Sequence, residues 1–156
     1  MKIYLFRHGE AKEATEDPER GLTDKGKDDV KTVAKAMRKR EVEISKIFHS
    51  PKKRAKETAE IVHEEFDSAS LEEKSTLNPN DPVEPWKDEI LGMEENLILV
   101  GHLPFLSILA SQLLGIKEVD VPVFLPATCM ALEKDDQSLT FQLEWVLYPK
   151  EAMEDI

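Results

Sequence analysis

The sequence is poor in cysteine and has no long apolar run. Its 156 residues include one cysteine, Cys129, so no intramolecular disulfide can form and this usage fits a reducing compartment. No apolar stretch approaches the ~18 residues of a membrane-spanning helix. The N-terminus also lacks the basic segment and apolar core of a secretory signal. We therefore expect a cytoplasmic protein in which Cys129 is a small buried side chain.

Basic residues are outnumbered by acidic ones. There are 21 Lys and Arg residues against 32 Asp and Glu, which gives a formal net charge of −11. This balance disfavours nucleic acid and membrane surfaces as partners, because both attract clustered cations. It also gives an anionic substrate no long-range attraction, so an anion site must act through local groups. With no repeat or linker, we expect one domain over residues 1–156.

Short apolar runs predict buried strands that alternate with helices. Strands are expected at 3–6, within 44–48 and at 97–100, and a hairpin at 129–132 and 139–147. Helix-spaced apolar residues predict helices from Thr23 to about residue 40, over 52–66, with Pro51 in the first turn, and from Pro104 to Gly115. The segment 67–95 is harder to assign, with a short helix expected over 86–93. This order predicts a three-layer α/β/α sandwich with a mostly parallel sheet.

A histidine lies just beyond the carboxyl end of each of two expected central strands. Arg7-His8-Gly9-Glu10 follows the first strand, and Gly101-His102 follows the strand at 97–100. Ligands bind at this end of the strands in open α/β sheets. Arginine presents a charged fork suited to phosphate oxygens, and a neutral histidine beside it can act as a nucleophile. Arg54, one turn into a helix that follows a strand, would add a second fork to an anion site.

Four motifs in this order closely resemble the histidine phosphatase superfamily, which includes the phosphoglycerate mutases. They are Arg7-His8-Gly9-Glu10, Leu22-Thr23-x-x-Gly26, Ser50-Pro51-x-x-Arg54-Ala55-x-x-Thr58 and Gly101-His102-Leu103-Pro104. The resemblance covers residues 1–115. The short chain leaves no room for the family's larger cap, and in this it is most similar to the SixA-type phosphohistidine phosphatase branch.

The resemblance implies the histidine phosphatase fold and four catalytic residues. His8 would attack phosphorus and carry it as a phosphohistidine. Arg7 and Arg54 would bind the non-bridging oxygens, and His102 would hydrogen-bond the phosphoryl group. These roles agree with the residue chemistry, because phosphoryl transfer depends mostly on positioning and on charge stabilisation. A phosphate ion is accordingly expected to fit the pocket.

No position matches the family's general acid. Glu10, Asp17, Asp81 and Glu84 are candidates by location alone. An alkoxide leaving group needs a positioned acid, whereas a phosphorylated imidazole can be protonated beforehand and leave as a neutral ring. We therefore expect a metal-independent phosphatase that acts on phosphohistidine in a partner protein, such as a phosphorelay or phosphotransferase carrier.

Two other functions remain open, a small-molecule phosphomonoesterase and a phosphoprotein-binding regulatory module with little turnover. No cofactor is expected. A metal site built from His8, His49 and His102 is disfavoured, because the adjacent arginines would repel the cation. His49 is a candidate for the pocket rim, and His63 is expected at the surface of the second helix.

Overall fold

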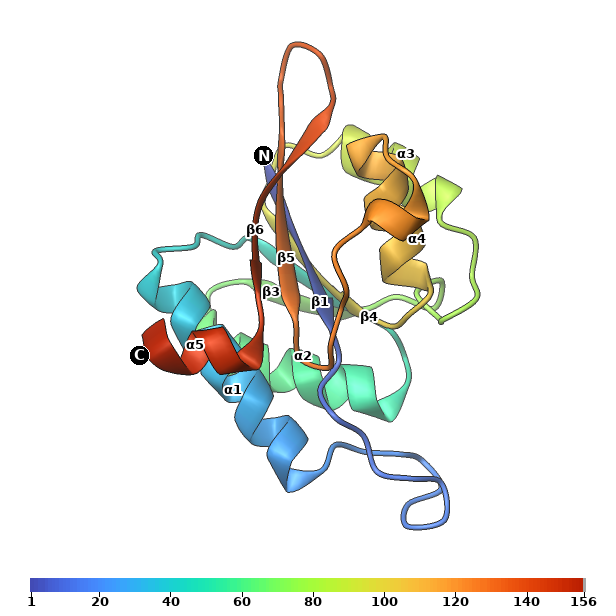
Figure 1. Cartoon of the computed structure of the whole chain (residues 1–156), viewed down its shortest axis with the longest axis vertical. Coiled ribbons are helices and arrows are strands. Elements are labelled where there is room, and N and C mark those ends of the chain that lie inside the picture. The colour runs from blue at the N-terminus through green and yellow to red at the C-terminus, as the bar shows by residue number, and fades with distance from the viewer. Residues whose placement is uncertain (156) are drawn as a thin grey trace.

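The computed structural model describes residues 1–155 and contains a six-stranded sheet. The strand order is β3-β2-β4-β1-β5-β6 (Figure 1). β1 to β4 run parallel to one another, whereas β5 is antiparallel to β1 and β6 is antiparallel to β5. The strands are β1 (Lys2–Arg7), β2 (Lys46–His49), β3 (Ser70–Glu73), β4 (Leu97–Gly101), β5 (Cys129–Lys134) and β6 (Phe141–Leu147). This confirms the expected mostly parallel sheet with a hairpin at one edge.

Helices cover both faces of the sheet (Figure 1). One face of the sheet is covered by α1, α2 and α5, and the other by α3 and α4. Each face has its own cluster of buried apolar side chains. The helices are α1 (Asp24–Lys39), α2 (Lys53–Glu65), α3 (Glu84–Leu91), α4 (Phe105–Leu114) and α5 (Pro149–Asp155). The three-layer sandwich predicted from the sequence is thus confirmed. Among the described helices, none is both long and apolar enough to cross a membrane.

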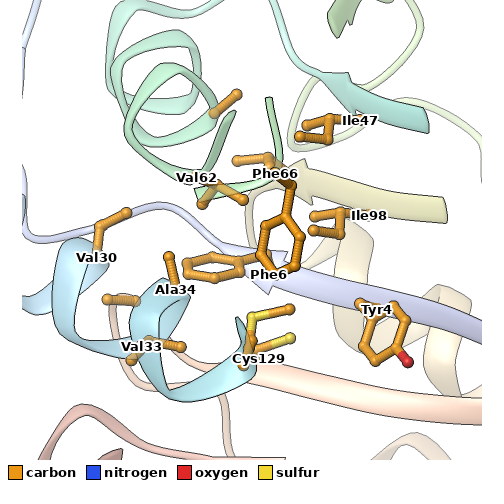
Figure 2. Close-up of a cluster of buried hydrophobic side chains, with 14 of the residues drawn as sticks. Tyr4, Phe6, Val30, Val33, Ala34, Ile47, Val62, Phe66, Ile98 and Cys129 are labelled. Atoms are coloured by element: carbon orange, nitrogen blue, oxygen red, sulfur yellow. The ribbon is translucent and has the colours of Figure 1, made fainter. Parts of the chain in front are cut away.

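β1 contributes side chains to both apolar clusters. Phe6 faces the layer of α1 and α2, where it lies among Val30, Ala34 and Val62 (Figure 2). Leu5, its neighbour in the strand, belongs to the cluster on the opposite face, as the alternation of a strand requires. Because both faces are covered, the strand is apolar throughout its centre. Cys129 is fully buried in the same cluster as Phe6, as expected.

The helix boundaries follow local chemistry. Thr23 caps α1, and its Oγ accepts the amide of Gly26 at 2.9 Å, as predicted. α4 ends at Gly115, whose φ of 68° is a left-handed conformation that glycine adopts without strain. Pro51 was expected in the first turn of α2 but precedes the helix, because Lys52 is its N-cap residue.

The strand β3, the helix α5 and the short 3-10 helix η1 (Glu118–Asp120) were not predicted. All four residues of β3 are exposed, so the strand shows no apolar pattern and forms because β2 offers a free edge to pair with. α5 is seven residues long and buries Ala152, and Asp155 near its end accepts two hydrogen bonds from Arg40. Both β3 and α5 depend on partners that are distant in the sequence. α3 begins two residues before the expected helix, at Glu84.

Candidate active site

The carboxyl ends of β1 and β4 bring the two predicted histidines together. Arg7 lies opposite Gly101 in the β1–β4 register, and the His8 amide donates to the Gly101 carbonyl at 3.1 Å. The rings of His8 and His102, each one residue beyond its strand, have centroids 5.1 Å apart. Arg54 lies in the first turn of α2, which follows β2, the strand next to β4.

His8 is held in one tautomer. Its Nδ1 lies 2.7 Å from the carbonyl oxygen of Gly9, and because a carbonyl only accepts, Nδ1 carries the proton. The lone pair is therefore on Nε2. The ring is only 9% exposed, and burial, together with the charges of Arg54 and Arg7, lowers its pKa to about 4. The imidazole is thus neutral at physiological pH and available as a nucleophile.

His102 is buried and neutral as well. Burial first, then the neighbouring His8 and Arg54, lower its pKa to about 3. Its Nε2 lies 2.8 Å from the Ser50 Oγ. Its Nδ1 is buried without a hydrogen-bond partner in the described part of the chain. Since buried polar atoms are rarely left unpaired, this nitrogen is suited to contact a polar ligand atom beside His8.

Three guanidinium groups lie near these rings, and sequence reasoning missed one of them. Arg7 donates from Nη1 to the Phe124 carbonyl at 2.8 Å, and its buried Nε has no partner among residues 1–155. Arg20 lies in the loop before α1 and donates from Nε to the Lys12 carbonyl at 3.0 Å. Burial first and the charge of Arg20 second lower the pKa of Arg54. Arg20 directly precedes the Gly21-Leu22-Thr23 stretch, a position that could have drawn attention to it.

None of these arginines forms an ion pair with a carboxylate of residues 1–155. Arg7, Arg20 and Arg54 are each partly buried. Unpaired charges are costly in such a place, and an oxyanion would offset that cost through charge-assisted hydrogen bonds. The cluster is therefore chemically suited to bind a phosphoryl group.

Thr58 connects the turn after β1 to α2. Its fully buried Oγ accepts the amide of Gly9 at 3.0 Å and donates to the Arg54 carbonyl at 2.8 Å. This pair of bonds fixes the turn that carries His8 relative to the helix that carries Arg54. The spacing Arg54-x-x-x-Thr58 in the sequence thus has a structural reason.

Gly9 and Gly26 allow α1 to begin against the same turn. A Cβ on Gly9 would lie 2.8 Å from both the Gly26 carbonyl oxygen and the Val30 Cγ2. The backbone at Gly9 thus makes a close approach to α1. The absence of a side chain at Gly9 is required by packing.

Glu10 and Asp17, two of the candidate acids, are hydrogen-bonded away from His8. Glu10 is exposed, and its Oε2 accepts the hydroxyl of Thr23 at 2.7 Å. Asp17 accepts the Gly21 amide at 2.9 Å and the Lys53 ammonium at 3.2 Å. These bonds, the Gly21 amide foremost, lower the pKa of Asp17. Its carboxyl group is thus kept ionised, which is unfavourable for donating a proton.

Asp81 and Glu84 lie at the start of the α3 layer. Asp81 accepts the amide of Asn78 at 2.8 Å. Glu84 is the first residue of α3, and a hydrogen bond from its own amide lowers its pKa. The Glu84 carboxyl group is therefore kept ionised, which is unfavourable for donating a proton.

The two remaining histidines are engaged by backbone carbonyls. His49 is 4% exposed, and its Nδ1 donates to Ser50 at 2.8 Å. His63 is half-buried on α2, and its Nε2 donates to Ala69 at 3.0 Å. Within residues 1–155, no group of three or more His, Cys, Asp or Glu side chains is arranged to hold a metal ion.

Solved phosphatase structures share this architecture. The protein histidine phosphatase SixA complexed with tungstate matches with a TM-score of 0.82 and 26% identity, over 97% of this chain and 99% of that one. A mycobacterial glucosyl-3-phosphoglycerate phosphatase complexed with VO3 matches with a TM-score of 0.73 over 92% of this chain and 97% of that one. Its 16% identity shows a common fold alone. The chain has the histidine phosphatase fold without a large cap.

Sequence relatives define the family. A family model described as Histidine phosphatase superfamily (branch 1) matches residues 3–81. The phosphohistidine phosphatase SixA of Escherichia coli is 25% identical over 155 residues, which cover 96% of this chain and 94% of SixA. The mitochondrial serine/threonine-protein phosphatase Pgam5 of Drosophila mojavensis is 34% identical over 96 residues, 56% of this chain and 33% of Pgam5. The chain belongs to the histidine phosphatase superfamily and is a phosphatase hydrolase, and its resemblance to the SixA-type branch is confirmed.

Proposed function

We propose that this chain is a metal-independent phosphatase that removes phosphate from phosphohistidine on a partner protein, through a covalent phosphohistidine at His8. The observation that carries the proposal is the bond from Nδ1 of His8 to the Gly9 carbonyl at 2.7 Å. It leaves an unprotonated Nε2 next to guanidinium groups that no carboxylate of residues 1–155 neutralises. A phosphorelay or phosphotransferase carrier is the kind of partner that offers this substrate.

In the first step the Nε2 lone pair of His8 attacks phosphorus. A P–N bond forms to His8 as the P–N bond to the substrate ring breaks. The electron pair stays on the substrate nitrogen, and the ring, protonated beforehand on its other nitrogen, leaves as neutral imidazole. Arg7 and Arg54 bind the non-bridging oxygens, and Nδ1 of His102 donates to one of them while Nε2 accepts the Ser50 hydroxyl.

In the second step water attacks the phosphorus on His8. The P–N bond breaks, its electron pair returns to Nε2, and inorganic phosphate leaves with the oxygen and one proton of the water, the other proton passing to solvent. The pKa of about 4 then keeps the released His8 neutral and ready for another cycle. Dividing the hydrolysis in this way replaces one difficult displacement by two easier ones.

The arrangement of the carboxyl groups supports P–N rather than P–O cleavage. Hydrogen bonds lower the pKa of two of the four candidate acids, Asp17 and Glu84, and Glu10 is engaged by the Thr23 hydroxyl. General acid catalysis is typically worth about 10²–10⁴-fold, so an alkoxide would leave slowly. The name of the SixA relative supports the same substrate class.

A small-molecule phosphomonoesterase is the second candidate. The same fold is found in a glucosyl-3-phosphoglycerate phosphatase, so the fold is compatible with this function as well. It is distinguished by turnover of sugar phosphates at rates above those on phosphohistidine. A regulatory module with little turnover is distinguished by phosphoprotein binding that persists without His8.

The test is to trap the intermediate. The protein is mixed with a carrier protein phosphorylated on histidine by phosphoramidate, quenched at alkaline pH and examined by mass spectrometry. We expect acid-labile phosphate on His8, release of inorganic phosphate, and no requirement for added metal in the presence of a chelator. His8→Asn should abolish the label, because asparagine can keep the bond to the Gly9 carbonyl but has no nucleophilic Nε2.

His49→Asn is the matched control. His49 also donates from Nδ1 to the carbonyl of the next residue, and asparagine can keep this bond, so the variant removes a buried imidazole that the proposed mechanism does not use and should keep the label. Phosphate on His49, or release at the wild-type rate by His8→Asn, would contradict the assignment of the nucleophile. Absence of both label and release in the wild type would favour a phosphate ester or a binding role.

A further inference from the structure

An open pocket of about 630 Å³ lies beside the arginine cluster. Five of its lining residues are cationic, namely Arg20, Lys52, Lys53, Arg54 and Lys56, and Glu19 is the one acidic residue among them. We call this the basic pocket. Because Arg54 also belongs to the candidate active site, the basic pocket opens next to the position of the phosphoryl group.

Two of these lysines carry charge that is not neutralised within the described chain. Lys53 lies 3.2 Å from Asp17 and 3.8 Å from Glu19. Lys52 and Lys56, in contrast, are exposed and make no ion pair with residues 1–155. Lys52 is the N-cap residue of α2, Lys56 lies in the first turn of the helix, and both line the basic pocket. This helix end has no side-chain cap, and its free amides add to the positive potential.

The position of the basic pocket contrasts with the charge of the whole chain. The protein has a formal net charge of −11, so an acidic partner is repelled by most of its surface. A single phosphoryl group needs only the arginine cluster. The outward-facing Lys52 and Lys56 are then free to contact a further part of a larger substrate.

We propose that the basic pocket docks acidic side chains that flank the phosphohistidine on the partner protein. The proposal rests on the proposed function and adds a preference for the surroundings of the phosphorylated residue. Carboxylates near the substrate histidine would pair with Lys52 and Lys56 while the phosphoryl group occupies the arginine cluster. Attraction at this one place and repulsion elsewhere would orient the partner with its histidine toward His8.

The test compares two synthetic peptides that each contain a single phosphohistidine. In one peptide four glutamates flank the histidine, and in the other four glutamines take their place. We expect the wild type to cleave the acidic peptide with a kcat/KM about tenfold higher at low salt. This ratio should fall toward one at about 0.5 M salt, where the Debye length is only a few ångströms.

Lys52→Gln combined with Lys56→Gln should reduce the preference about three- to tenfold, as expected for two partly exposed ion pairs. The ratio is taken within one variant, so any effect on the chemical step cancels. Lys31→Gln with Lys35→Gln is the matched control, because these exposed lysines have the same spacing on α1 and also lack ion pairs with the described residues. This pair should leave the ratio unchanged.

Binding separates this proposal from the proposed function. The unphosphorylated acidic peptide, fluorescently labelled, is titrated with each variant and followed by anisotropy, which needs no turnover. Binding that Lys52→Gln/Lys56→Gln weakens supports the docking surface even if no peptide is hydrolysed. Equal cleavage of both peptides, or a preference that survives this double substitution, overturns the docking surface and leaves phosphohistidine hydrolysis standing.

Discussion

At the scale of single residues, the site combines two neutral histidines with three guanidinium groups that form no ion pair with the described residues. One of the three arginines, Arg20, has an unfavourable backbone conformation. Its φ of 53° is left-handed, a conformation that costs a non-glycine residue on the order of 1–2 kcal/mol. The charge of the same residue helps to lower the pKa of both His8 and Arg54.

Arg20→Gly should separate stability from activity. Glycine relieves the backbone strain, so we expect the free energy of unfolding to stay the same or to rise by up to about 1 kcal/mol. Loss of the third guanidinium should lower kcat/KM on phosphoramidate by about 10- to 100-fold. Urea denaturation and phosphate release measure the two effects.

Glu41→Gly is the control for this prediction. Glu41 has a φ of 61° and is exposed just after α1, so glycine should give a similar change in stability there with activity unchanged. An Arg20→Gly variant with wild-type kcat/KM would show that Arg20 contributes nothing to the chemistry.

At the scale of elements, the start of α1 is packed against the turn that carries His8. The Thr23 amide donates to the Glu10 carbonyl at 3.0 Å, and Gly26 lies directly against the same backbone. On the other side, Thr58 holds this turn to α2. Two helices from different parts of the chain therefore position one short turn.

Gly26→Ala should destabilise the protein although alanine favours helices. The new Cβ would collide with the Glu10 carbonyl oxygen and lie 2.9 Å from the Glu10 amide nitrogen. Neither backbone atom can move without shifting the turn, so we expect a loss of about 1–3 kcal/mol in urea denaturation, together with lower phosphatase activity.

Gly92→Ala provides the comparison. Gly92 follows α3 with a φ of −89°, and its nearest contact to a new Cβ is 3.6 Å. This substitution should be neutral or slightly stabilising. Equal losses at both positions would mean that the close approach at Gly26 is not what makes its substitution costly.

At the scale of the whole molecule, burial of the two site histidines links stability to pH. Their pKa values are lowered to about 4 for His8 and about 3 for His102, whereas an unfolded histidine titrates near 6.5. Between these values the unfolded chain binds protons that the native protein does not. The contribution of both rings to the free energy of unfolding is therefore fully present above about pH 6.5. It is lost as the pH falls toward 4 for His8 and toward 3 for His102.

For each buried histidine, we expect the free energy of unfolding to fall by roughly 2 kcal/mol as the pH is lowered from 6.5 to 5. Urea denaturation at several pH values should show this decline in the wild type. It should be markedly smaller in a His8→Asn/His102→Asn variant, in which neither ring is present to titrate. An identical pH dependence in both proteins would mean that other groups cause the decline.

Much of the fold could be predicted from the sequence because the responsible signals are local. The run from Ile3 to Phe6, the cap at Thr23 and the stop at Gly115 each depend on neighbours in the chain. β3 could not be predicted in the same way, because its exposed residues form a strand only when β2 supplies hydrogen-bond partners. α5 likewise depends on contacts with α1.

In the candidate site, too, some features could be predicted from local sequence and others depend on distant segments. The sequence by itself determined which side chains follow the strands, namely Arg7, His8 and His102, and it predicted that they meet at one edge of the sheet. Only the tertiary structure decided the tautomer of His8 and the approach of Arg20 to the lysines and Arg54 at the start of α2. The reason is physical. The position of a strand end follows from local periodicity, whereas proton positions and pKa values depend on burial and charge contributed by distant segments.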